Sequence, residues 1–270
     1  MVSQQTRDQH RRYDPVRQHG GVDANGMPDH IAPSIGHMRM NTLRLDVLGS
    51  PQIALADRPI VLRTRKTLAL LVYLAVEGGQ HPRELLADLF WPEAEVEDAR
   101  ASLRTTLSYV RQPLGPDADA ILLATRESVG LIPSSPLDFD VRGLAEAQQL
   151  IRQTPGNGST SPEGVRRQIE MAVDRYRGPF LAGVSVPDAP DFEGWLEGQR
   201  THWRGVQEEL LERLARWQIF DGDSGAAVTT FERWTAVNPD EETAWKSLIE
   251  LHLRTADSAA ARRAWKTYRE

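Results

Sequence analysis

Arginine and hydroxyl side chains gather in residues 95–115, EVEDARASLRTTLSYVRQPLG, in a pattern suited to binding a polyanion. At about 100° per residue, the apolar side chains form one stripe of a helix: Ala99, Leu103, Leu107, Val110 and Leu114. A second stripe, roughly 150° away, holds Ala101, Arg104, Thr105, Ser108 and Gln112. Arg100 and Arg111 lie between the two stripes.

Such a face has the chemistry to read DNA, because arginine recognises base edges in the roughly 12 Å wide major groove and hydroxyl groups bind phosphate. We expect base contacts from Arg104, Thr105 and Ser108. We expect phosphate contacts from the surrounding polar residues, Arg63, Arg65, Lys66, Arg100, Arg111, Gln112 and Arg126. For a single helix the alternative stays open, that its arginines only face water.

The segments around this helix favour the DNA interpretation. Short alternating apolar runs in residues 42–62 predict a small antiparallel meander. Two helices follow, one ending at Gly78 and a shorter one closed by Pro92. After the arginine-bearing helix, two apolar runs predict a hairpin with its turn at residues 125–127. This is the order of a winged helix-turn-helix domain, which we place at residues 41–133.

The second half, residues 138–270, is predicted to be helical throughout. A shift of 34 residues superposes DSGAAVTTFERW (223–234) on DSAAARRAWKTY (257–268), and this period is typical of tetratricopeptide repeats. Stacked helical hairpins of this kind bury a continuous core. The second unit stops at Glu270, so we expect the native chain to continue. The fold class is therefore mainly α, a winged-helix domain of α+β type before an all-α repeat domain.

Composition limits the other possibilities. The formal net charge is −6, so a DNA site has to be a local basic patch. The chain has no cysteine, which removes disulfides, thiolate catalysis and cysteine-based zinc sites. Residues 1–40 are polar without periodicity and are predicted to be a disordered tail. No apolar run of about 18 residues occurs, so we expect a cytoplasmic protein with no membrane partner.

Motifs for catalysis are absent from the sequence. It contains no G-x-x-x-x-G-K-[ST] loop, no H-E-x-x-H and no G-x-S-x-G. The seven histidines are scattered, and the tryptophans of the helical half are expected to fill the core. We therefore expect no enzyme activity, no catalytic residues, no cofactor and no metal site.

Two long segments resemble a known family. Residues 63–115, with LFWP and ARASLRTTLS, resemble the winged-helix domain of the Streptomyces antibiotic regulatory proteins, which is related to OmpR-type DNA-binding domains. YRGPFLAGVSVPDAPDFEGWLEGQR and the repeat segment resemble the bacterial transcriptional activation domain that follows it in that family.

The resemblance implies a transcriptional activator that binds promoter-proximal direct repeats in double-stranded DNA as a homodimer. It also implies recruitment of RNA polymerase holoenzyme, including its sigma factor, and control of specialised-metabolite genes. By analogy with OmpR-type domains, the loop WPEAEVED faces the polymerase through Glu93, Glu95 and Glu97.

One departure from the family and one alternative function belong beside this interpretation. Where relatives carry further basic residues, this sequence has Tyr109 and Gln112, and Pro113 is expected to end the helix early. We therefore expect weak electrostatic affinity, with cooperative or partner-assisted binding. The alternative is a protein-interaction scaffold, in which the repeats bind protein or peptide and the winged helix docks a protein.

Overall fold

Three short strands open the part of the chain that the computed structural model describes, residues 41–154 and 163–270. They form the predicted meander, β1 (Leu43–Asp46), β2 (Gln52–Leu55) and β3 (Arg58–Pro59). The third strand is shorter than its apolar run suggested, because Val61 faces solvent and the chain leaves the sheet toward the first helix. The tail predicted over residues 1–40 lies outside the described residues.

A fourth strand completes this sheet, and the sequence did not predict it. β7 (Leu137–Phe139) pairs in parallel with β1, which gives the order β3-β2-β1-β7. Three residues are too few to show a period of two. Directly after β7, Asp140 is 1% exposed, and its Oδ2 accepts hydrogen bonds from Val47 N and Leu48 N, both at 2.8 Å. The end of β1 is therefore held by a carboxylate from the segment after the hairpin.

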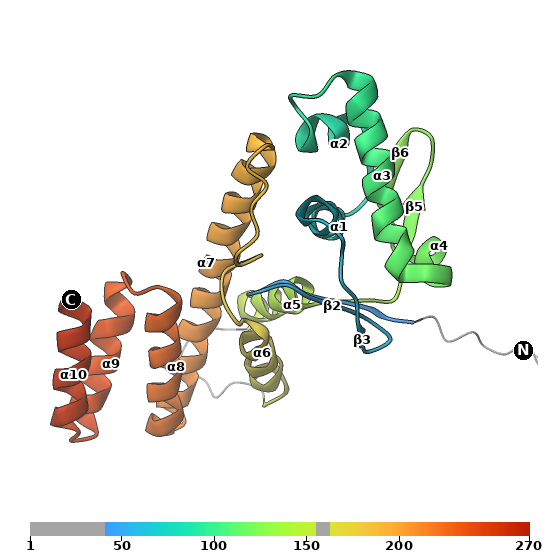
Figure 1. Ribbon diagram of the computed structural model, residues 1–270. Helices are drawn as coiled ribbons and strands as arrows, with labels where there is room; N and C mark the ends of the chain where they lie inside the picture. Colours follow the sequence, from blue (N-terminus) through green and yellow to red (C-terminus); the bar gives the residue numbers. More distant parts are fainter. Residues whose placement is uncertain (1–40, 155–162) are drawn as a thin grey trace, which may run out of the picture. The chain divides into compact units, whose positions relative to one another are not determined.

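Three helices and a second sheet form the winged helix-turn-helix (Figure 1). The helices are α1 (Arg65–Glu77), α2 (Arg83–Phe90) and α3 (Val96–Leu114), followed by the short α4 (Ala118–Ile121). The strands are β4 (Gln80–Pro82), β5 (Leu122–Ala124) and β6 (Ser128–Leu131), in the antiparallel order β4-β6-β5. The predicted hairpin is thus confirmed as β5–β6. Gly130 is needed in it, since an added Cβ would lie 2.0 Å from the carbonyl oxygen of Gly79.

Helix α3 buries the stripe that its sequence predicted. The five apolar residues of this stripe, from Ala99 to Leu114, are each at most 4% exposed. The helix passes through Pro113 and ends at Gly115, whose φ is 55° and whose N–H bonds Arg111 O and Gln112 O. The expectation that Pro113 ends the helix early was therefore wrong. Proline lacks only the one N–H that would bond Tyr109 O, and so near the end of the helix that loss is tolerated.

Helices α5 to α10 make up the C-terminal part (Figure 1). They are α5 (Asp140–Gln153), α6 (Glu163–Arg175), α7 (Pro190–Phe220), α8 (Ser224–Val237), α9 (Glu242–Arg254) and α10 (Ser258–Arg269). The predicted 34-residue repeat corresponds to the starts of α8 and α10. Asp223 and Asp257 cap these helices by accepting from Ala226 N at 3.0 Å and Ala260 N at 2.9 Å. The repeated Asp-Ser pair is thus a helix start signal.

Aromatic side chains join the first half of α7 to the winged helix-turn-helix. Phe192 is fully buried, with its ring centroid 4.9 Å from that of Phe90 on α2. Trp195 packs 5.0 Å from the ring of Tyr73 on α1 and donates from Nε1 to Oε1 of Glu77 at 2.7 Å. These contacts fix the back of α1 and α2, so that α3 and the hairpin remain uncovered by α7. None of the helices in residues 41–154 and 163–270 is long and apolar enough to cross a membrane.

Candidate nucleic-acid interface

The outer face of α3 presents the three residues from which we expect base contacts. Arg104, Thr105 and Ser108 are all exposed, on the side opposite the buried stripe. The hydroxyl of Thr105 donates to Ala101 O at 3.0 Å, so its hydrogen is already used and its oxygen can still accept a hydrogen bond. The structure therefore brings these side chains together on one rigid helix, as a base-reading surface requires.

A groove runs between α3 and the β5–β6 hairpin, and arginine dominates its lining. Arg83, Arg100, Arg104 and Arg126 line it, against a single carboxylate, that of Glu84. Arg126 lies exposed in the turn of the hairpin. The local charge of this groove is positive although the whole chain is acidic, which is the local patch that a DNA site in this protein needs.

Arg83 is a member of this groove that the sequence analysis missed. Its Nε donates to Thr125 O at 2.8 Å, and its backbone N bonds Glu127 O at 2.9 Å, so it is fixed beside the hairpin turn. Burial, together with the charge of Arg104, lowers the pKa of its guanidinium. The sequence alone gave no sign of this position, because it depends on the pairing of β4 with β6. Arg83 directly follows β4, and this pairing brings it to the hairpin.

The predicted phosphate-binding arginines fall into two groups. Arg100 is paired with Glu97 at 2.9 Å and with Glu84 at 3.3 Å, and Arg111 is paired with Asp119. Among the residues that the structure describes, the other predicted phosphate-binding arginines, Arg63, Arg65 and Arg126, form no ion pair, and neither does Arg104, from which a base contact is expected. The second group therefore offers its full charge to an anion.

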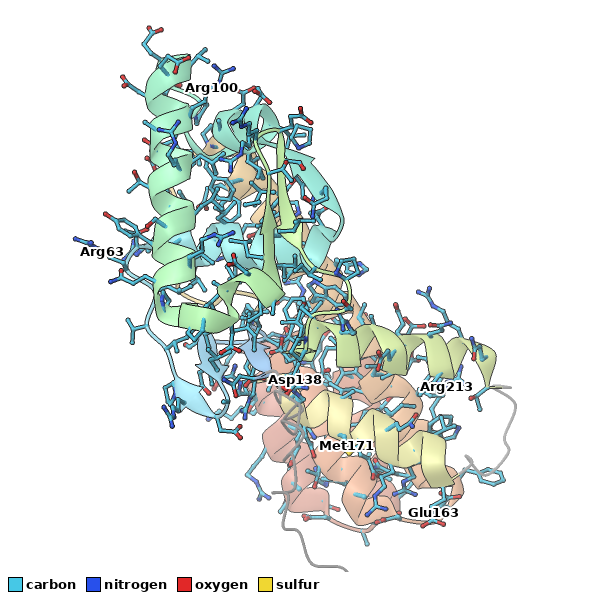
Figure 2. All side chains as sticks on the ribbon, turned by 90° about the vertical axis from the view of Figure 1, so that its right-hand side faces the viewer. Arg63, Arg100, Asp138, Glu163, Met171 and Arg213 are labelled. Carbon is cyan, nitrogen blue, oxygen red and sulfur yellow. The ribbon has the colours of Figure 1, made fainter. Side chains whose placement is uncertain are left out.

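Arg63 brings a positive charge to the part of α3 where the sequence lacks one. Its guanidinium lies over the ring of Tyr109, 4.6 Å from the centroid, which is a cation–π contact. Figure 2 shows Arg63 extending outward past α3, with Arg100 near the start of the same helix. Gln112 is exposed one turn further along. Tyr109 thus acts as a platform for an arginine that belongs to a different segment.

Lys66 points away from this face. Its Nζ donates to Phe90 O at 2.6 Å, pairs with Asp188 at 2.7 Å and lies 5.0 Å from the centroid of the Trp91 ring. Its side chain is only 17% exposed. Lys66 is engaged in the contact between α1, the end of α2 and the segment before α7, while its neighbour Arg65 is exposed.

The loop between α2 and α3 leaves its carboxylates at the surface. Glu93 and Glu95 are exposed, and Glu95 is the residue just before α3, without a side-chain capping bond. Glu97 lies in the first turn of α3 and is bound to Arg100. No group of three or more potential metal ligands occurs within the described ranges.

Comparison with known proteins identifies the class of this chain. Residues 139–270 match the family model described as "Bacterial transcriptional activator domain". Over 228 residues the chain is 23% identical to the transcriptional regulatory protein MoaR1 of Mycobacterium tuberculosis, and this match covers 82% of the chain and 70% of MoaR1. Over 228 residues it is 25% identical to the regulatory protein AfsR of Streptomyces coelicolor, covering 81% of this chain and 21% of AfsR. The chain is therefore a transcriptional regulator with a bacterial transcriptional activator domain, and it is similar to regulators of the Streptomyces antibiotic regulatory protein type.

The architecture of this regulator is shared with a solved structure. That structure is Mycobacterium tuberculosis EmbR in complex with a low affinity phosphopeptide, with a TM-score of 0.62 and 23% identity. The likeness covers 84% of this chain but only 59% of the EmbR chain, so the regulator spans less than two thirds of that protein. It confirms the predicted fold class, mainly helical with a small sheet-containing region before the helical domain.

Proposed function

We propose that this chain activates transcription by binding promoter-proximal direct repeats in double-stranded DNA, with α3 in the major groove and the β5–β6 hairpin against the adjacent backbone. The observation that carries the proposal is the set of arginines without carboxylate partners that follows α3 and the hairpin. The chain as a whole has a net charge of −6, so this positive patch is a local feature of an acidic protein. Such a patch is suited to binding phosphate groups.

The proposal gives the side chains different roles, and their positions support this division. Arg104, Thr105 and Ser108 read base edges, because they share the exposed face of a single helix. Phosphate contacts come from exposed or partly exposed residues around that face: Arg63, Arg65, Arg83, Gln112 and Arg126. Arg100 and Arg111 join them only by giving up their present carboxylate partners. Lys66 is left out, since its ammonium group is already bound by Phe90 O and Asp188.

The rest of the proposed mechanism concerns partners. Two copies bind side by side on a direct repeat, and the exposed Glu93 and Glu95 of the α2–α3 loop face RNA polymerase holoenzyme with its sigma factor. The regulated genes are those of specialised metabolism. These statements rest on the family type together with the exposure of the loop.

A footprint on DNA upstream of neighbouring genes, at low and moderate salt, tests the DNA site. We expect protection of a short direct repeat, and we expect Arg104→Ala to abolish it. Arg216→Ala is the matched control, since Arg216 is an exposed arginine on α7 that pairs with Glu212 outside the interface. Protection that survives Arg104→Ala would refute the assignment of α3. No salt-dependent affinity for any duplex would favour the protein-interaction scaffold instead.

A further inference from the structure

The helical domain contains a pocket that lies outside the DNA interface. One face of α7 forms its floor, α8 forms one wall, and residues 176–179, which follow α6, form the other. Its volume is about 460 Å³, within the range of small-molecule sites. Apolar surface comes from Pro179, Ala236 and Val237. The pocket therefore has the size and the mixed lining of a site for a small organic ligand.

Four arginines surround this pocket, with Glu197 as the one carboxylate in its lining. Arg200 donates to the carbonyl oxygens of Phe180, Leu181 and Val184 at 3.3, 3.4 and 2.9 Å. These carbonyl groups hold the guanidinium in place, and its Nη1 also forms a long ion pair with Oε2 of Glu197 at 3.4 Å.

Arg177 is held in the same way, by the carbonyl oxygens of Asp46 at 3.1 Å and Ser50 at 3.3 Å. Arg204 approaches Glu208 only to 3.8 Å, with its side chain about half exposed. Arg233 is the member of the group with a close carboxylate partner, Asp174 at 2.7 Å. The lining thus holds four arginines against one carboxylate, and Arg177 is held by carbonyl oxygens alone, so the pocket carries an excess of positive charge that favours a bound anion.

A buried amide marks the floor of the pocket. Gln207 is 1% exposed and donates from Nε2 to Val173 O at 3.3 Å, which fixes the orientation of the amide. Its Oε1 is buried and has no hydrogen-bond partner among the described residues. Buried polar atoms are rarely left without partners, and each exception calls for an explanation. Because this oxygen lies just behind the pocket lining, a hydrogen-bond donor on a ligand would supply the missing partner after a small shift of the Gln207 side chain toward the pocket.

We propose that the pocket binds a small organic anion that also carries a hydrogen-bond donor. The carboxylate or phosphate group pairs with Arg200 and Arg204, a hydroxyl or N–H group donates to Oε1 of Gln207, and the apolar body packs on Pro179 and Val237. On one face of α7, Gln207 follows Arg204 by three residues and Arg200 by seven. The acid group of the ligand and its hydrogen-bond donor are therefore separated by about 5 to 10 Å.

Saturation-transfer NMR titrations on the full chain test the site. The probes are 4-hydroxybenzoate and 4-hydroxyphenyl phosphate, each with its counterpart lacking the hydroxyl, benzoate and phenyl phosphate. The uncharged probe is 4-hydroxybenzamide. We expect at least one hydroxylated anion to bind saturably, at least tenfold more tightly than its counterpart and than the amide. The tighter of the two hydroxylated anions identifies the acid group.

Variants separate the two halves of the recognition. Arg204→Met should weaken the anion at least tenfold, while Arg216→Met, on the same helix but outside the pocket, should leave it unchanged. Gln207→Met should remove the preference for the hydroxylated probe, and this ratio of affinities is independent of any loss of folded protein. The proposal is overturned by the absence of saturable binding for every probe, or by equal affinities of Arg204→Met and Arg216→Met.

Discussion

The buried carboxyl group of Asp140 should make the stability of this protein depend on pH in an unusual direction. Burial raises its pKa from 3.8 to about 6, against the opposing effect of the hydrogen bonds from Leu48 N and Val47 N and the charge of Arg175. The folded chain therefore holds the proton more tightly than the unfolded chain does. For this residue the free energy of unfolding is highest at low pH, and it falls as pH rises through the window from about 4 to 6.

The magnitude follows from the two pKa values. Ionisation of Asp140 costs the folded state about 1 kcal/mol at about pH 4.5 and about 3 kcal/mol at about pH 7.5. Asp140→Asn removes this titration and keeps the shape of the side chain. The amide disturbs the bond that Oδ1 accepts from Val141 N, but this penalty is the same at every pH. Relative to the wild type, the variant should therefore gain about 2 kcal/mol between the two pH values.

Urea unfolding of both proteins at a series of pH values measures this difference. Other carboxyl groups titrate in the wild type and in the variant alike, so their contributions cancel in the comparison. A stability gap that stays constant with pH would show that Asp140 titrates at its ordinary value. If the wild type instead became more stable relative to Asp140→Asn as pH rises, the hydrogen bonds from Val47 N and Leu48 N would lower the pKa of Asp140 by more than burial raises it.

Five further substitutions, in three experiments, test other contacts. Arg65→Met should lower the slope of log affinity against log salt by about 0.9, because one phosphate contact is lost, whereas Lys66→Met should leave that slope unchanged. Filter binding measures both, and equal slopes would contradict the separation of these two residues. Phe192→Ala should cost about 3–5 kcal/mol in the free energy of unfolding, measured with urea, and a loss under about 1 kcal/mol would contradict its packing. Asp223→Ala should lower the free energy of unfolding by about 1 kcal/mol, measured by thermal unfolding. Asp223→Asn should keep most of the wild-type stability, since asparagine also caps helices.

The sequence predicted those features that depend on local periodicity. The buried stripe of α3 and the turn of the hairpin were both visible, because a helical period and a polar turn between apolar runs are read within one segment. The repeated start of α8 and α10 was visible for the same reason, since a capping Asp-Ser pair recurs at a fixed distance.

What the sequence could not predict depends on contacts between distant segments. Lys66 stands beside Arg65 in the sequence, yet a carbonyl and a carboxylate from other elements draw it inward. Tyr109 suggested a gap in the basic face of α3, but Arg63 lies over its ring and restores a positive charge there. Arg83 joined the interface only through the pairing of β4 with β6. In each case the partner is set by tertiary structure.

The parallel pairing of β7 with β1 bears on how regulators of this type can exchange their parts. The match to the activator domain begins at residue 139, inside β7, which borders β1. The next residue, Asp140, accepts a hydrogen bond from Val47 N just after the end of β1. A hybrid joined just after the hairpin would give the recipient's β1 a foreign edge strand and a foreign carboxylate. Working chimaeras should therefore carry residues 134–140 together with their own β1, so recombination is favoured within a sheet-matched pair of domains and disfavoured between arbitrary ones.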